Sequence, residues 1–203
     1  MTVFDHETRE RIERYRGPIF TVYSDQVTMS GGGTATRDVV ENKGAVGVVA
    51  LDDVGRVVLI RQYRHPVGQW LVELPAGLLD EPGEKAYRTA ARELAEETGL
   101  TAGRWDVLVD LQVSPGLSDE AVRVYLARDL APVPDADRHV GTDEETDLGV
   151  HRVDLDEAVA AVFTGGIQNT LAVAGLLAAA YARDHDWTTL RPADAEWPAR
   201  PDH

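Results

Sequence analysis

Alternating and continuous apolar runs predict a domain in which strands and helices mix. The continuous run at 45–51 is typical of a buried strand, and residues 56–62 are expected to return beside it after the turn at 52–55. An Ala- and Leu-rich run at 168–183 predicts a helix. Further strands are predicted at 70–74, 104–113, 121–128 and 149–153, and a helix at about 155–163 after a cap at Asp154 or Asp156. The pattern therefore predicts an α/β (α+β) fold.

The two ends of the chain differ in pattern from its middle. Residues 18–30 and 34–41 alternate around three glycines, so we expect residues 1–42 to form a small N-terminal β-appendage ahead of a main domain at 43–185. Alternatively, these strands are the first of a single sheet. Residues 1–16 carry many charges without an apolar period and are expected to wrap the surface. Residues 186–203 hold three prolines and predict a loose C-terminal tail, which Trp187 and Trp197 could pin.

Residues 76–100 contain a helix-forming run that begins after Pro82-Gly83 and stops at Gly99. Three carboxylates, Glu93, Glu96 and Glu97, share one flank of this helix. Like charges at this spacing destabilise a helix by roughly 0.2–0.5 kcal/mol per pair. A bound divalent cation would remove the repulsion, and carboxylate oxygens are what Mg²⁺ prefers. The alternative is a solvated acidic face.

The same stretch resembles the Nudix box, G-x5-E-x7-R-E-U-x-E-E-x-G-U, where U is aliphatic. The match from Glu84 through Arg92-Glu93-Leu94-Ala95-Glu96-Glu97-Thr98-Gly99-Leu100 is complete. Six residues instead of five separate Gly77 from Glu84, and the extra one falls in a turn, where insertion is tolerated. A motif of this length favours a metal site over a solvated face. The resemblance implies a Nudix α/β/α sandwich around a mixed sheet.

The resemblance to the Nudix family also implies a set of metal ligands. Glu93 and Glu97 match carboxylate ligands, and the main-chain carbonyl of Ala76 matches a third ligand position. Glu96 would bind metal directly or through water. Glu84 and Arg92 match structural positions that orient the carboxylates. The implied cofactor is Mg²⁺, with Mn²⁺ as a substitute.

Three features outside the box resemble the ADP-ribose pyrophosphatase subfamily. Pro115 stands 15 residues after Leu100, within the loop 114–120. The sequence Gln62-Tyr63-Arg64 precedes Glu73-Leu74-Pro75-Ala76-Gly77, and an Arg37-containing strand leads into the main domain. The departures are His65-Pro66 and Asn42-Lys43.

The implied reaction is hydrolysis of the pyrophosphate bond of ADP-ribose to AMP and ribose 5-phosphate. The alternatives are hydrolysis of another nucleoside diphosphate sugar, such as GDP-mannose, and a non-catalytic Nudix module that senses a nucleotide. The complete set of box carboxylates speaks against the last of these.

The subfamily resemblance implies roles for further residues. A general base is expected in the acidic loop at 141–148, where Glu145 is favoured and Glu144 is the close second. Arg37 and Arg64 match positions that contact the phosphates or ribose, and Glu120 matches a position near metal and substrate. Tyr23, Tyr63 or Trp70 could hold the adenine, although Tyr63 and Trp70 also suit a core. The subfamily further implies a homodimer in which the appendage completes the partner's site.

Charge and cysteine content narrow the range of partners. A net charge of −15 argues against sequence-independent binding to nucleic acid or to anionic membranes. It leaves a small nucleotide sugar as partner, because a metal and local arginines can reverse the potential in one cleft. The chain has no cysteine, no apolar run long enough to span a membrane and no apolar leader, so we expect a cytoplasmic protein.

Overall fold

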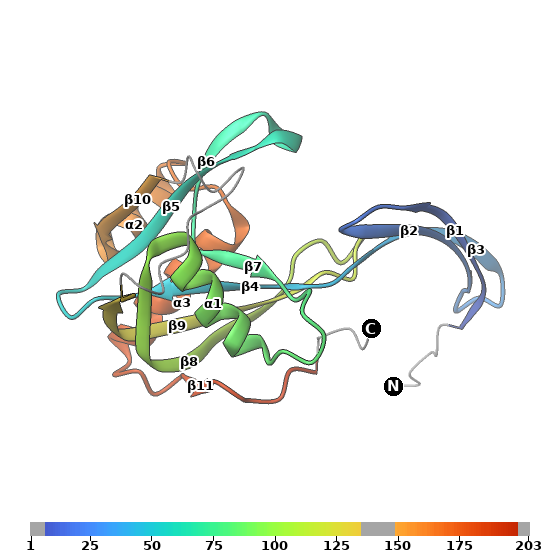
Figure 1. The fold of residues 1–203 in the computed structure, drawn as a ribbon. Coiled ribbons are helices and arrows are strands. Elements are labelled where there is room, and N and C mark those ends of the chain that lie inside the picture. Colours follow the sequence, from blue (N-terminus) through green and yellow to red (C-terminus); the bar gives the residue numbers. More distant parts are fainter. Residues whose placement is uncertain (1–6, 135–148, 199–203) are drawn as a thin grey trace.

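The structure is a computed structural model that describes residues 7–134 and 149–198 (Figure 1). Its described strands form three sheets: a five-stranded mixed sheet, a three-stranded sheet beside it, and a separate three-stranded sheet at the N-terminal end. Three α-helices accompany them in the described residues. The predicted α/β class is therefore confirmed.

The five-stranded sheet forms the centre of the molecule and has the order β11-β8-β9-β4-β7. Its members are β4 (Ala45–Ala50), β7 (Ala76–Leu78), β8 (Leu100–Gln112), β9 (Ala121–Pro132) and β11 (Arg191–Pro192). β4 runs parallel to β9, and the other pairs are antiparallel. All six residues of β4 are buried, because neighbouring strands flank it and helices cover both faces.

Helices on opposite faces of this sheet make the predicted sandwich. On one face, α1 (Ala86–Thr98) buries Ala90 and Leu94 in a cluster that includes Val48 of β4. On the other face, α2 (Leu155–Phe163) and α3 (Thr170–Asp184) contribute to a second cluster that includes Val49. Within the described residues, no helix is long and apolar enough to cross a membrane.

The second sheet differs from the prediction for residues 56–62. It has the order β10-β5-β6, built from β10 (Gly149–Asp154), β5 (Arg56–Arg64) and β6 (Gln69–Glu73), with a short 3-10 helix (His65–Val67) between the last two. The predicted pairing of this strand with β4 is wrong beyond a single bridge between Leu51 and Val57. β9 and β7 already occupy both edges of β4, so β5 turns away and pairs with β6 and β10.

Capping side chains fix the ends of the helices. Asp154 accepts hydrogen bonds from the main-chain N–H groups of Asp156 and Glu157, as one of the two predicted caps for α2. Asn169 accepts from the N–H of Ala172, so α3 begins at Thr170 instead of Gln168. Gly99 ends α1 with a left-handed backbone at φ 67°, which glycine adopts without strain.

The N-terminal strands form a sheet of their own that projects from the rest of the molecule (Figure 1). β1 (Thr8–Arg16), β2 (Phe20–Thr28) and β3 (Thr34–Asn42) pair in sequence order, all antiparallel. The prediction that residues 1–16 wrap the surface is wrong for 8–16, which pair with β2. Their alternating charges fit a strand, because all nine residues of β1 are exposed. The alternative of one continuous sheet is also wrong.

The C-terminal segment is docked as far as residue 198, so the prediction of a loose tail is wrong there. β11 pairs with β8, and Arg123 donates hydrogen bonds to the carbonyls of Ala195 at 2.7 Å and Glu196 at 2.9 Å. The prediction that two tryptophans pin this segment is confirmed. Arg128 lies over the Trp187 ring at 4.6 Å, and Arg123 lies over the Trp197 ring at 4.7 Å.

Candidate active site

Two glutamates of α1 meet the turn at the start of β7. The Oε2 atom of Glu97 accepts a hydrogen bond from the N–H of Ala76 at 2.9 Å. The Glu93 carboxylate lies directly against Gly77, where a Cβ atom would overlap it. Gly77 is therefore required at this position for the side chain of Glu93 to reach the turn. The helix and the turn bring Ala76, Glu93 and Glu97 together, as the sequence predicts.

Arg92 forms ion pairs with three glutamates of the box along the same flank of α1. Its guanidinium lies 2.7 Å from Glu93, 3.0 Å from Glu96 and 3.5 Å from Glu84. Asp80 lies at 4.0 Å. The hydroxyl of Thr89, a buried residue, donates to Oε2 of Glu84 at 2.9 Å. One guanidinium thus orients several carboxylates along one flank of α1.

Burial and charge crowding alter the acidity of the glutamates at this site. The pKa of Glu93 is raised to about 6, chiefly by burial and also by the nearby Glu96 and Asp80, while Arg92 acts in the opposite direction. Burial also raises the pKa of Glu120, with a smaller contribution from Asp119. Holding these carboxylates ionised together costs free energy that a nearby cation would recover.

The donor set suits a hard divalent cation. Glu93 and Glu97 bring carboxylates to the turn at Ala76, whose main-chain carbonyl is the third donor that the family resemblance implies, so oxygen is the common donor. No group of three or more His, Asp or Glu side chains is gathered to hold a metal in the described ranges. Two carboxylates with one carbonyl suffice for Mg²⁺, because this ion keeps several waters.

A cavity of about 490 Å³ opens beside the Ala76–Gly77 turn. Arg64, Ala76 and Glu120 line it together with Ile19 and Asn42 from the N-terminal sheet and its exit. Arg64 is held there by a two-pronged ion pair with the buried Glu73, at 3.0 and 2.7 Å. The structure therefore places Arg64 and Glu120 in one cavity with the Ala76–Gly77 turn.

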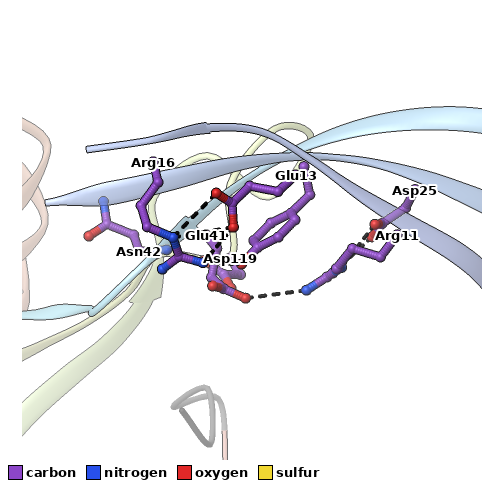
Figure 2. A network of polar contacts seen from close by, with 8 residues as sticks. Arg11, Glu13, Arg16, Asp25, Glu41, Asn42 and Asp119 are labelled. Atoms are coloured by element: carbon purple, nitrogen blue, oxygen red, sulfur yellow. Dashed lines mark hydrogen bonds and ion pairs between the residues drawn. The ribbon is translucent and has the colours of Figure 1, made fainter. Parts of the chain in front are cut away.

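The loop 114–120, which ends at Glu120 in this cavity, is hydrogen-bonded to β3. The N–H of Val40 donates to the carbonyl of Leu117 at 2.9 Å, and the N–H of Asp119 donates to the carbonyl of Val40 at 3.3 Å. Asp119 in turn accepts from the N–H of Asn42 at 2.8 Å. Figure 2 shows Asn42 at one end of the polar network of the N-terminal sheet. These contacts between the loop and the appendage hold Glu120 in position.

Other predicted site residues lie elsewhere. Arg37 is exposed on β3, where it donates to the carbonyl of Thr36 at 3.0 Å, and it is not part of the described cavity lining. Glu144 and Glu145 lie outside the described residues. Tyr23 packs beneath Arg11 at 4.6 Å.

The aromatic side chains of the β5–β6 hairpin are not part of the core. Tyr63 and Trp70 face each other across β5 and β6 and are 43% and 46% exposed. The expectation of a core position is therefore wrong for both, because Tyr63 and Trp70 pair in a stretch of the β5–β6 hairpin beyond its pairing with β10.

Sequence reasoning missed two residues of this site. Glu73 is only 2% exposed and orients Arg64. The sequence did contain a signal for Glu73. A buried carboxylate is stable only beside a cation, and Arg64, nine residues away, is a candidate partner. Thr89 was hidden among the variable positions of the box, and no spacing rule picks out a hydroxyl that points at Glu84.

Comparison with known proteins identifies the family of the chain. A family model described as NUDIX domain matches residues 41–171. An ADP-ribose pyrophosphatase of Mycobacterium tuberculosis is 48% identical over 99% of this chain and 95% of its own length. An ADP-ribose pyrophosphatase of Bacillus subtilis is 35% identical over 78% of this chain and 84% of its own. A crystal structure of an ADP compounds hydrolase shares the fold, with a TM-score of 0.77 at 24% identity, over 91% of this chain and 98% of its own. The chain belongs to the Nudix hydrolase family.

Proposed function

We propose that this protein hydrolyses the pyrophosphate bond of ADP-ribose to AMP and ribose 5-phosphate. The observation that carries the proposal is the meeting of Glu93 and Glu97 with the Ala76–Gly77 turn at the wall of a cavity. Two relatives named ADP-ribose pyrophosphatase support the choice of substrate. Mg²⁺ is the proposed cofactor, with Mn²⁺ as a substitute, because the donors are oxygens.

The side chains of the site divide the work of this reaction. Glu93, Glu97 and the carbonyl of Ala76 would hold the cation, with Glu96 beside them directly or through water. The cation would neutralise the pyrophosphate and activate a water for attack on phosphorus. Arg64, already oriented by Glu73, would pair with phosphate oxygens through its planar guanidinium. Glu84 and Arg92 would hold the carboxylates in place.

A carboxylate must also take the proton of the attacking water. We propose Glu145 for this role, with Glu144 as the second candidate, in the loop outside the described residues. The Glu145→Gln variant should lose about 10²–10⁴ in kcat with little change in KM. Loss in Glu144→Gln instead would assign the role to that residue. If both variants keep full activity, Glu120, which lines the cavity, becomes the next candidate.

A panel of nucleotide sugars tests the proposed reaction. Purified protein is incubated with ADP-ribose, ADP-glucose and GDP-mannose, with Mg²⁺, with Mn²⁺ or with a chelator, and the products are identified by mass spectrometry. We expect AMP and ribose 5-phosphate from ADP-ribose, and no reaction in the chelator. Preferred cleavage of GDP-mannose would assign another nucleotide sugar. Tight binding of a nucleotide without any cleavage would make the protein a sensing module.

We further propose that the protein is a homodimer, in which the N-terminal β-appendage, at about residues 18–41, completes the site of the partner and residues 43–185 form the hydrolase domain. The exposed apolar side chains of the appendage support this, since Ile12, Tyr15, Ile19 and Phe20 are 37–54% exposed in the isolated chain. Exchange of an identical element is a low-cost way to cover such a surface. Arg37 would then reach substrate across the subunit boundary.

Mixing two inactive variants tests the shared site. Arg37→Ala and Glu97→Gln proteins are combined under conditions that exchange subunits. In a hybrid dimer, one site carries both defects and the other carries neither, so up to half of the wild-type activity per hybrid should return. A fully active monomer in light scattering, or no recovery despite proven exchange, would exclude this arrangement.

A further inference from the structure

Asn42 carries a buried hydrogen-bond acceptor that the protein itself leaves unused. It is the last residue of β3, and its main-chain N–H is fixed by Asp119 at 2.8 Å. Its side-chain Oδ1 atom is buried and meets no hydrogen-bond donor in the part of the chain that the structure describes. A buried acceptor without a donor lowers stability, so each such atom in a native structure requires an explanation.

The position of Asn42 supplies that explanation. It lines the cavity of about 490 Å³ together with Arg64, Ala76 and Glu120. Figure 2 shows its side chain at the end of the network nearest the hydrolase domain, apart from the Arg16–Glu13 and Arg11–Asp25 ion pairs. Asn42 is therefore a residue of this cavity, and it also lines a neighbouring hollow with Arg16 and Gly17.

We propose that Oδ1 of Asn42 accepts a hydrogen bond from a neutral donor of the nucleotide sugar and so determines substrate specificity. This inference rests on the proposed function. A carbonyl oxygen cannot pair with phosphate oxygens, which are acceptors themselves, and these already have Arg64 as a partner. The remaining donors of a nucleotide sugar are its ribose hydroxyls and the exocyclic amine of its base.

The backbone around Asn42 suits a residue that must recognise a substrate group. Asn42 pairs with Phe20 across β2 and β3, and Asp119 holds its N–H from the other side. Two different segments thus fix the backbone of Asn42, and its short side chain has little freedom to lose when substrate binds. A site built to pair with a donor group discriminates strongly against an analogue that lacks it, because the buried acceptor then stays unpaired.

The test pairs protein variants with substrates that lack single donors. Values of kcat/KM are measured for ADP-ribose, for analogues that each lack one ribose hydroxyl, and for inosine diphosphate ribose, which lacks the adenine amine. The proteins are wild type, Asn42→Leu, Asn42→Asp and, as a matched control, Gln26→Leu. Gln26 also carries an amide in the appendage, but it bonds Thr36 at 2.8 Å and is not among the residues that line the cavity.

We expect wild type to prefer ADP-ribose over one of these analogues by about tenfold or more. Asn42→Leu should abolish that preference, whereas Asn42→Asp, which keeps an acceptor, and Gln26→Leu should retain it. The analogue concerned identifies the donor as a hydroxyl or as the amine. Asn42→Leu should also melt no lower than wild type, because it removes an unpaired buried atom.

An unchanged preference in Asn42→Leu for every analogue would overturn the proposal, as would a preference lost equally in Asn42→Asp. A lower melting temperature with equal loss of activity on all substrates would make Asn42 merely structural. Failure of the proposed function has a different signature, namely wild-type protein that leaves ADP-ribose intact. The same analogue series is then applied to the nucleotide sugar that the panel identifies, by turnover or by binding.

Discussion

Arg92 and Arg123 each stand at the centre of a charged cluster, but the balance of charge in the two clusters is opposite. Four carboxylates lie within 4.0 Å of Arg92: Asp80, Glu84, Glu93 and Glu96. Around Asp110 the ratio reverses, because Arg123 and Arg191 approach to 2.6 and 2.8 Å. Arg123 also donates hydrogen bonds to two main-chain carbonyls of the C-terminal segment.

The acidities of the two clusters follow this difference. The pKa of Glu93 is raised to about 6 by burial, and one arginine does not offset it. The pKa of Asp110 is lowered despite burial, because hydrogen bonds from Arg123 and Arg191 outweigh it. The charges of the Arg123 cluster are paired within the chain, so this cluster stabilises the fold. The Arg92 cluster retains an excess of negative charge, which is what a cation-binding site requires.

The largest expected effect comes from removing Glu97, a proposed metal ligand on the same helix as the Arg92 cluster. Glu97→Gln should lower kcat by at least about 100-fold, since changes to residues that only orient metal ligands already cost 10–100-fold. The fold should persist, because a like-charge pair on α1 is lost. Steady-state rates at saturating Mg²⁺ measure the loss of kcat, and circular dichroism checks that the fold persists. Wild-type rates in both Glu93→Gln and Glu97→Gln would exclude this helix as the metal site.

The next effect is on stability and concerns the other cluster. Arg123 is 2% exposed, so Arg123→Met breaks a buried ion pair and leaves two carbonyls unpaired. We expect a loss of about 3 kcal/mol in the free energy of unfolding, measured in urea. The kcat of folded protein should be unchanged. Arg104→Met is the matched control, because its pair with Asp106 is exposed and contributes less than about 1 kcal/mol.

Sequence patterns predicted one cluster and missed the other for a physical reason. The Arg92 cluster lies within a single helix and turn, so spacing along the chain places its members together. Arg123 and its partners come from β8, β9 and the C-terminal segment, up to 73 residues apart. Their contact depends on strand register, which local periodicity does not specify. The predicted loose tail was wrong for this reason.

The distinction between local contacts and contacts of distant segments also applies to the fold and the cavity. The strands β2, β3, β4 and β9 were predicted because each carries its own apolar pattern. The sequence did not predict that β5 would pair away from β4, because this depends on which strands occupy the edges of β4. Asn42 stood out in the sequence only as a departure from the subfamily pattern. Its unpaired oxygen became visible when β3 and the loop 114–120 were placed together.

A pH titration of the metal-free protein sharpens the contrast between the two clusters. The folded-state pKa of Glu93, about 6, lies above its ordinary value of 4.5, so ionising Glu93 destabilises the fold. This cost is absent below pH 4.5 and complete above pH 6. Glu93→Gln should therefore stabilise metal-free protein by up to about 2 kcal/mol above pH 6, and not below pH 4.5.

Asp110 should show the opposite dependence in the same titration. Its pKa is lowered in the fold, so its contribution to stability is present above its ordinary pKa and is lost as the pH falls. Asp110→Asn should therefore destabilise the protein most at neutral pH and least in acid. Urea unfolding across this range, in a chelator, checks both variants. Parallel profiles for the two would contradict the assigned difference in charge balance.

The smallest expected effect concerns Thr89, which acts on the Arg92 cluster through another residue. Its buried hydroxyl holds Glu84, and Glu84 shares the guanidinium of Arg92 with Glu93 and Glu96. Thr89→Val should free Glu84 and let Arg92 pair more tightly with the other two glutamates, in competition with the cation. The Mg²⁺ concentration for half-maximal rate should rise about fivefold, as loss of one hydrogen bond of about 1 kcal/mol predicts. The kcat at saturating Mg²⁺ should stay unchanged.

Two matched variants separate this role from a general loss of stability. Thr89→Ser keeps the hydroxyl and should retain the wild-type Mg²⁺ dependence. Thr98→Val removes a hydroxyl from the same helix that donates to the carbonyl of Leu94, outside the Arg92 cluster, and should also leave the Mg²⁺ dependence unchanged. A fivefold rise in both Thr89→Val and Thr98→Val would show that any loosening of α1 weakens metal binding. A rise confined to Thr89→Val would place this hydroxyl at the end of a chain that runs through Glu84 and Arg92 to the metal ligands.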